Sequence, residues 1–185
     1  EEVVALDFKS SESPANMVFS DSEAWQWNEE GGGSLSWSEG SRYKPPVRSP
    51  FTLGLVRDLE VRDFAMEAEV MQVGKEYAHR DICFFLHFTS PSYFTYVHLS
   101  TRPDARAHNV FLVANAARAP LLPVQEKGVE WGRDTWHLVK VDSSPARGTV
   151  QVFFEDMTTP LMEAPLKGDG WGRVGIGSFD DPGCI

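Results

Sequence analysis

The sequence contains few cysteines. Only Cys83 and Cys184 occur in 185 residues, and neither has the spacing of a zinc site. Cys83 stands among Ile82, Phe84 and Phe85, so we expect a buried thiol there. A disulfide between the two cysteines requires the C-terminal segment to pass close to Cys83, and the sequence leaves that open.

Positive charge and long apolar runs are also scarce. The chain has 17 Lys and Arg against 27 Asp and Glu, a net charge of −10. Nucleic acids and anionic membranes attract clustered positive charge, so neither is expected as a partner. No apolar run approaches the roughly 18–20 residues that cross a bilayer, so no membrane insertion is expected. The chain begins at Glu1-Glu2 without an apolar leader, and we expect a leader to have been removed.

A helical stripe is absent as well, whereas alternation of period two recurs along the chain. With 15 Gly and 12 Pro the chain suits a fold with many turns, and its length suits a single domain over 1–185. One short helical turn near 21–25 would be capped by Asp21. Strands are expected at 3–8, 17–20, 33–38, 51–57, 63–73, 80–88, 93–100, 109–115, 136–142, 148–155 and 172–179.

So many strands in one domain predict an all-β fold: a two-sheet antiparallel β-sandwich of the jelly-roll type. The alternation assigns one face of each strand to the core. The residues expected to point inward include Phe64, Met66, Ala68, Val70, Ile82, Phe84, Leu86, Phe88, Val97, Leu99, Val110 and Leu112.

The opposite face of three successive strands mixes aromatic and hydrogen-bonding side chains. It comprises Asp81, Cys83, Phe85 and His87, then Phe94, Tyr96 and His98, then Asn109, Phe111, Val113 and Asn115. Sugar rings pack their C–H faces on aromatic rings and need directed donors and acceptors for their hydroxyls. We therefore expect this face to floor a glycan cleft. The alternative is that a loop such as 101–108 or 116–130 covers it.

The order of several motifs resembles the concanavalin A-like lectin/glucanase superfamily. These motifs are Trp25 and Trp27, "YKPPVRSP", "DICFFLHF", "YFTYVHLS", "HNVFLVANAARAP", "WHLVKV", "GTVQVFFED" and "GRVGIGSFDDPG". Within the superfamily the chain is most similar to secreted bacterial domains of the 3-keto-disaccharide hydrolase and laminin G-like types.

The resemblance implies a secreted or periplasmic carbohydrate-active domain, with a carbohydrate as its ligand. It could be a glycoside hydrolase acting on a 3-keto-disaccharide or a larger glycan, a lectin-like module without catalysis, or a laminin G-like interaction domain. Retaining glucanases of the superfamily carry Glu-x-Asp-x-x-Glu on one strand, and this chain lacks that motif. Glu67 and Glu69 are expected on a solvated strand face instead.

For catalysis, Asp81 is the candidate base, with His98 or His108 as proton carrier. The residues expected to bind substrate are His79, Arg80, His87, Tyr96, Asn109, Asn115 and Trp131. Two of these have structural alternatives: Arg80 can pair locally to end a strand, and Trp131 can simply pack. His137 is expected to be a hydrogen-bonded core histidine.

A structural calcium ion is the one cofactor that the resemblance suggests, and no organic cofactor is expected. Members of the superfamily hold calcium with acidic residues from the first and last strands, and "SFDDPG" resembles half of such a site. Asp7, Asp180 and Asp181 are the candidate ligands, because carboxylate oxygens suit this ion. The turn-forming character of Asp-Asp-Pro-Gly is the alternative explanation. The oligomeric state stays undetermined.

Overall fold

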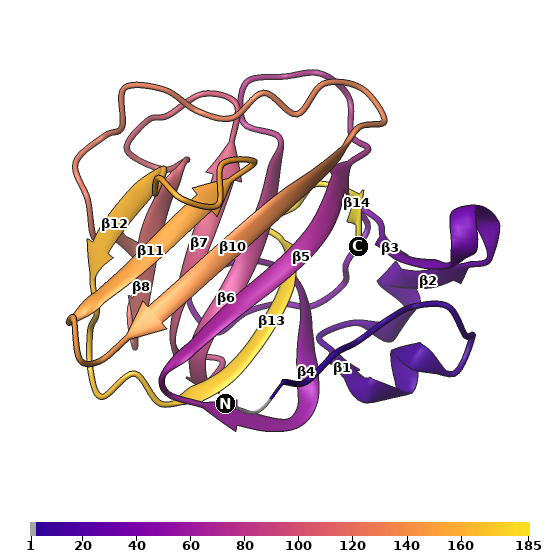
Figure 1. The fold of residues 1–185 in the computed structure, drawn as a ribbon, viewed down its shortest axis with the longest axis horizontal. Coiled ribbons are helices and arrows are strands. Elements are labelled where there is room, and N and C mark those ends of the chain that lie inside the picture. Colours follow the sequence, from indigo (N-terminus) through magenta and orange to yellow (C-terminus); the bar gives the residue numbers. More distant parts are fainter. Residues whose placement is uncertain (1–2) are drawn as a thin grey trace.

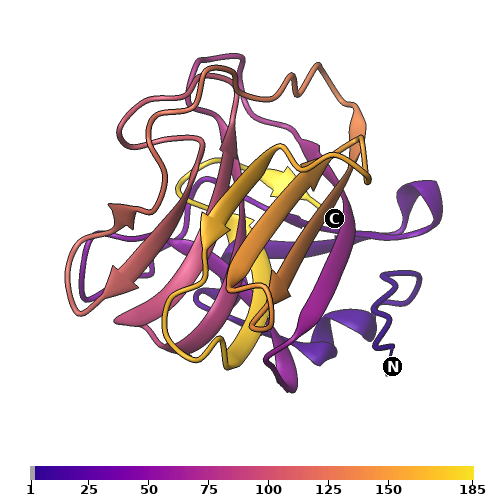
Figure 2. The same cartoon turned by 60° about the vertical axis from the view of Figure 1, so that its left-hand side comes forward.

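The computed structural model describes residues 3–185 and is a two-layer β-sandwich (Figures 1 and 2). Two antiparallel sheets of seven strands each pack face to face, and helix is confined to three short 3₁₀ segments. The predicted fold class is therefore confirmed. In the described part of the chain, no helix has the length and apolarity to cross a membrane.

Sheet A has the strand order β1–β4–β13–β6–β7–β8–β9. Its strands span Met17–Phe19 (β1), Thr52–Val61 (β4), Gly172–Ser178 (β13), Asp81–Ser90 (β6), Tyr93–Ser100 (β7), Asn109–Ala114 (β8) and Ala119–Pro120 (β9).

Sheet B has the order β12–β11–β10–β5–β14–β3–β2. Its strands span Met162–Pro165 (β12), Thr149–Phe154 (β11), Trp136–Ser144 (β10), Phe64–Gln72 (β5), Gly183–Cys184 (β14), Ser34–Trp37 (β3) and Trp25–Asn28 (β2). The 3₁₀ segments are Ser13–Asn16 (η1), Ser22–Ala24 (η2) and Glu30–Gly32 (η3).

Most predicted strands are present, with two kinds of exception. The expected strand at 3–8 does not form, and the short strands β2, β9, β12 and β14 were not predicted. The helical turn near 21–25 is confirmed as η2, where the Asp21 side chain accepts a hydrogen bond from the Glu23 amide. Strands of two to four residues carry too little alternation to be recognised without their partners.

The main core lies between the two sheets. Its fully buried residues come from both layers, among them Ile82, Phe84, Leu86, Val97, Leu99, Val110, Val139, Val141, Val150 and Val152. These are the inward positions that alternation predicted, because strand neighbours in register share a face. Both cysteines are buried free thiols, so no disulfide joins them.

One inward assignment was wrong, because β6 contains a bulge at His87. His87 has φ +51°, and the register with β7 shifts between Leu86 and Ser90. A bulge adds one residue and reverses the parity of those that follow. His87 therefore points between the sheets, where its Nε2 lies 2.8 Å from the Ser143 hydroxyl, and Phe88 packs on the other face.

The outer face of sheet A is buried as well. A second apolar cluster forms there from Leu53, Leu55, Cys83, Phe85, Phe94, Tyr96, Phe111, Val113 and Phe179. Tyr43, Val47 and Phe51, from the segment 41–51 that precedes β4, pack against it. Sheet A is thus buried on both faces over much of its area, as its nearly continuous apolar strands permit.

Replacing Leu86 by Ala should destabilise the protein by about 2–5 kcal/mol, because Leu86 is fully buried between the sheets and its truncation leaves a cavity. Urea unfolding at pH 7 measures this. Val124→Ala, at an exposed position, should change the unfolding free energy by less than about 0.5 kcal/mol. Equal effects of the two changes would contradict the assignment of the core.

Candidate functional site

The predicted site residues do share one face of sheet A. Cys83 pairs with His98, Phe85 with Tyr96, and His98 with Asn109, across β6, β7 and β8. Strand parity therefore brings together Asp81, Tyr96, His98 and Asn109, as the alternation predicted.

That face is not an open floor, and this expectation was wrong. Asp81 is 1% exposed, Tyr96 0%, His98 3% and Asn109 1%. The segment 41–51 and Phe179 cover the apolar part of the face, and the Arg118 guanidinium lies 3.9 Å from the Phe179 ring centroid. The alternative of a covering loop is correct for 116–130, which places Arg118 over the Phe111 ring, and the segment 41–51 adds cover that was not predicted. Alternation reports which side chains share a face and not which segment folds over them.

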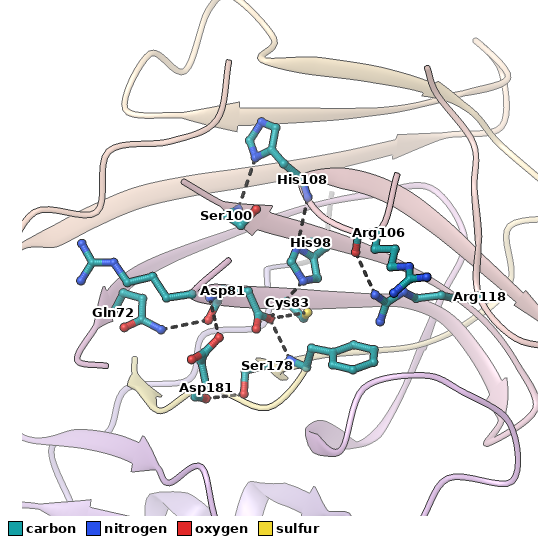
Figure 3. A network of polar contacts seen from close by, with 12 residues as sticks. Gln72, Asp81, Cys83, His98, Ser100, Arg106, His108, Arg118, Ser178 and Asp181 are labelled. Carbon is teal, nitrogen blue, oxygen red and sulfur yellow. Dashed lines mark hydrogen bonds and ion pairs between the residues drawn. The ribbon is translucent and has the colours of Figure 1, made fainter. Parts of the chain in front are cut away.

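Asp81 is the centre of a buried polar network (Figure 3). Its Oδ2 accepts hydrogen bonds from the Phe179 amide at 2.7 Å and from the Cys83 thiol at 3.1 Å. The Asp181 carboxylate in turn accepts from the Asp81 amide at 3.1 Å and from the Tyr77 hydroxyl at 2.6 Å. The network ties the start of β6 to the turn between β13 and β14.

The titration of these groups does not suit proton transfer at neutral pH. Burial, and then the nearby Asp181, raise the pKa of Asp81. Burial lowers the pKa of His98 to about 3 and that of His108 to about 4, so both rings are neutral. A neutral ring with so low a pKa is a poor proton carrier near pH 7. The His108 amide donates to His98 Nδ1 at 3.2 Å, so His98 carries its proton on Nε2.

Three predicted binding residues instead hold loops in place. The Trp131 side chain is 0% exposed and donates to the Arg80 carbonyl at 3.2 Å, so the packing alternative is correct for it. Arg80 donates to the Gly132 carbonyl at 2.7 Å. Asn109 clamps the loop after β9, donating to the carbonyls of Leu122 and Pro123.

The remaining predicted residues lie apart from one another. His79 is partly exposed, with Nε2 2.9 Å from Asp104 Oδ2. Asn115 is exposed just after β8, and His87 points into the core. His137 is a buried, hydrogen-bonded histidine, as expected: its Nδ1 lies 2.7 Å from Glu155 and its Nε2 2.8 Å from the Trp131 carbonyl.

Two of the three predicted calcium ligands lie together. Carboxylate oxygens of Asp81, Asp180 and Asp181 lie within 4.8 Å of one another, whereas Asp7 lies elsewhere and faces Lys9 at 3.8 Å. Asp81 Oδ1 is buried without a hydrogen-bond partner among the described residues. Three carboxylates, one of which has an oxygen without a hydrogen-bond partner, fit a hard cation such as calcium. They supply only part of the 6–8 oxygen ligands that calcium takes.

Asp81, Cys83 and His98 also lie within 4.8 Å of one another, a donor set of the zinc type. The tautomer of His98 argues against zinc there. A neutral imidazole that binds metal through Nε2 must carry its proton on Nδ1, and Nδ1 already accepts from the His108 amide.

An open groove remains at the other end of the same face of sheet A. It has a volume of about 410 Å³ and is lined by Val18, Asp58, Leu59, Glu60 and Arg173. Glu60 and Arg173 are partners in the ladder between β4 and β13, and Arg173 also pairs with Phe88. We call this the Glu60 groove.

Trp171 stands beside the Glu60 groove. Its side chain is 47% exposed, and its indole N–H donates to Glu60 Oε2 at 3.0 Å. The sequence reasoning missed this residue and favoured Trp131. The glycines on both sides of Trp171 were the available signal, because a tryptophan in a glycine-rich turn has little chain around it to bury it.

The fold is that of concanavalin A-like sandwiches. It is similar to the carbohydrate-binding module CBM66 from Bacillus subtilis, with a TM-score of 0.60 and 11% identity over 91% of this chain and 90% of that one. It is also similar to a lectin from Bauhinia forficata in complex with GalNAc, with a TM-score of 0.51 and 10% identity over 96% and 93%.

A third similar structure is a seed lectin from Lotus tetragonolobus, with a TM-score of 0.51 and 10% identity over 92% of this chain and 85% of the lectin. No protein-family model matches the sequence, and no curated protein matches it. At these identities the likeness establishes the fold, which hosts binding modules and enzymes alike.

Replacing His87 by Asn should flatten the loss of stability in acid. Burial lowers the pKa of His87 to about 4, so between pH 6.5 and 4 the unfolded chain takes up a proton that the folded protein excludes. Stability therefore falls as the pH falls through this window, by up to about 1.4 kcal/mol per pH unit for this group. Asn tolerates the positive φ and does not titrate.

Urea unfolding at pH 7.5, 6.0, 5.0 and 4.5 tests this. The difference between variant and wild type at pH 7.5, where the His87 ring is neutral in both states, gives the cost of the substitution itself. Equal slopes for the two proteins below pH 6.5 would contradict a buried neutral His87.

Proposed function

We propose that the protein is a lectin-like carbohydrate-binding domain and that the Glu60 groove is its ligand site. The observation that carries this proposal is an exposed tryptophan beside a carboxylate and a guanidinium, in the part of the sheet A face that stays open. The fold that the chain shares with a carbohydrate-binding module and two lectins supports it.

The chemistry of the groove suits a sugar ring. The indole of Trp171 offers an apolar plane for the C–H face of a pyranose or furanose. Glu60 and Asp58 accept hydrogen bonds from hydroxyls, and Arg173 donates to ring or hydroxyl oxygens. Val18 and Leu59 contribute apolar contact beside these groups. A small number of polar groups placed around apolar surface is typical of ligand sites.

Binding without catalysis is favoured over hydrolysis. The acid–base candidates Asp81, His98 and His108 are at most 3% exposed, and the two imidazoles are neutral near pH 7. A general acid or base must reach the substrate within hydrogen-bond distance, and these three groups are buried.

Trp171→Ala should weaken glycan binding by about 5- to 30-fold, since stacking and area burial by an exposed tryptophan contribute roughly 1–2 kcal/mol. A glycan array identifies a ligand, and calorimetry on the wild type and variant measures the loss. Trp136→Ala is the matched control, because Trp136 is 46% exposed but lies on β10 of sheet B. Glu60→Gln should weaken binding while leaving the melting temperature unchanged.

Equal losses for the two tryptophan variants would remove the Glu60 groove as the site. Binding of no glycan at all would remove the function itself and favour an interaction domain. Release of a sugar product by the wild-type protein would show hydrolysis and would overturn binding without catalysis.

We also propose that Asp81, Asp180 and Asp181 hold a structural calcium ion. Burial and the nearby Asp181 raise the pKa values of Asp81 and Asp180. A cation would offset the repulsion among these carboxylates, and it would give Asp81 Oδ1 a partner. It would also link the start of β6 to the turn before β14, and so would stabilise the folded state.

Calcium at one hundred times its dissociation constant should raise the unfolding free energy by about 2.7 kcal/mol, hence the melting temperature by roughly 5–10 °C relative to EDTA. Differential scanning fluorimetry measures this shift. Asp180→Asn should reduce it, whereas Asp63→Asn, an exposed change in the turn between β4 and β5, should not. A melting temperature that calcium and EDTA leave equal would exclude the ion.

A further inference from the structure

Strand β5 is paired along nearly its whole length on one edge only. On one side it pairs with β10 from Phe64 to Met71. On the other side it pairs with β14 at Met71 and Gln72 alone. Within residues 3–185, the positions 64–70 therefore have no strand partner on this edge, in the middle of a seven-stranded sheet. Their free backbone N–H and C=O groups on that side form a template for another strand.

A groove of about 1460 Å³ runs along this open edge. Its far wall comes from the segment 4–9 and from the hairpin of β2 and β3, including Trp27. Figure 1 places β14 and the C-terminus between β5 and β3, at one end of this gap in sheet B. We call it the β5 groove.

The floor of the β5 groove consists of apolar core side chains that are not fully buried. Phe64, Met66 and Ala68 face the core, yet they are only partly buried. Val70 occupies the same face one step nearer to β14 and is 0% exposed. The inward side chains of β5 are thus fully buried only next to β14. A strand that continued β14 along β5 would cover the partly exposed positions 64–68.

Strand β14 points into the β5 groove. Gly183 and Cys184 pair with both β5 and β3, and Ile185 exchanges two backbone hydrogen bonds with Leu35, at 2.9 and 3.0 Å. Continued in this register, a strand would face the positions from Glu69 back to Phe64. Six residues at about 3.3–3.4 Å each span roughly 20 Å.

We propose that the β5 groove binds one extended strand of a separate polypeptide, in which apolar and basic residues alternate, antiparallel to β5 and in line with β14. The side chains of such a strand are specified by its cross-strand neighbours. Residues opposite Phe64, Met66 and Ala68 point into the core and must be apolar. Those opposite Glu67 and Glu69 point outward, where basic side chains complement the two exposed carboxylates.

The test uses the peptide Lys-Val-Lys-Val-Thr-Val in two forms, free and fused directly after Ile185. In the fused form its first Lys lies opposite Glu69 and its three Val residues lie opposite Ala68, Met66 and Phe64. Hydrogen exchange should slow at the amides of 64–70 in both forms. The fused form should act more strongly, because the link raises the effective concentration of the strand.

Two controls separate strand pairing in this register from non-specific binding of the peptide. The fused peptide Val-Lys-Val-Lys-Val-Thr has the same composition but the opposite parity, and it should give no protection because its Lys residues would face the core. The double change Glu67→Lys and Glu69→Lys should weaken the free peptide about tenfold at low salt. Glu163→Lys on β12, an exposed carboxylate at the other edge of sheet B, should leave the affinity unchanged.

Protection at 64–70 by the free peptide would support a separate polypeptide as the occupant, whereas protection by the fused form alone would overturn the proposal. Equal protection by the peptide of opposite parity would overturn the proposal, as would the absence of protection by either form. Concentration-dependent dimerisation that protects the same amides without any peptide would assign the edge to a second copy instead.

Discussion

The burial of sheet A on both faces is the constraint on which the rest of the structure depends. Its inner face packs on sheet B, and the segment 41–51 covers the apolar part of its outer face. A polar side chain in the covered part of β6, β7 or β8 therefore has no access to water and can take hydrogen-bond partners only from within the protein. Asp81, His98 and Asn109 bond to backbone amides and carbonyls of the neighbouring loops, and His108 accepts from the Ser100 amide at the end of β7.

The same constraint decides which part of this face is open to a ligand. Had the outer face of sheet A been open, Tyr96 and Phe111, which stack at 5.3 Å between ring centroids, would have been the natural platform for a sugar. With that area covered, the ligand-accessible part of the face is reduced to its far end, where Glu60, Arg173 and Trp171 meet. The polar residues in the centre of the sheet are buried within the fold, and the exposed ones at its end form the ligand site that we propose.

Sheet B differs from sheet A in being incomplete beside β5. In a sandwich, each sheet shields the inner face of the other, so a missing stretch in one sheet leaves core side chains of both open to water. Phe64 and Met66 of sheet B and Val56 of sheet A all line the β5 groove. The predicted strand 3–8 does not fill this place. Phe8 lies at the far wall instead, where its carbonyl accepts the Trp27 indole N–H at 2.6 Å.

The sequence by itself determined the fold class, the positions of the longer strands and the parity of β5, β7 and most of β6. These follow from local alternation, which each strand carries within its own residues. It did not reveal the bulge at His87, where a single added residue reverses the parity of Phe88. Only the tertiary structure decided which face of sheet A is covered, that Trp131 is buried and Trp171 exposed, and that Asp81 rather than Asp7 lies with Asp180 and Asp181. These are contacts between segments far apart in the chain, and no local pattern records which distant segment will pack on a given face.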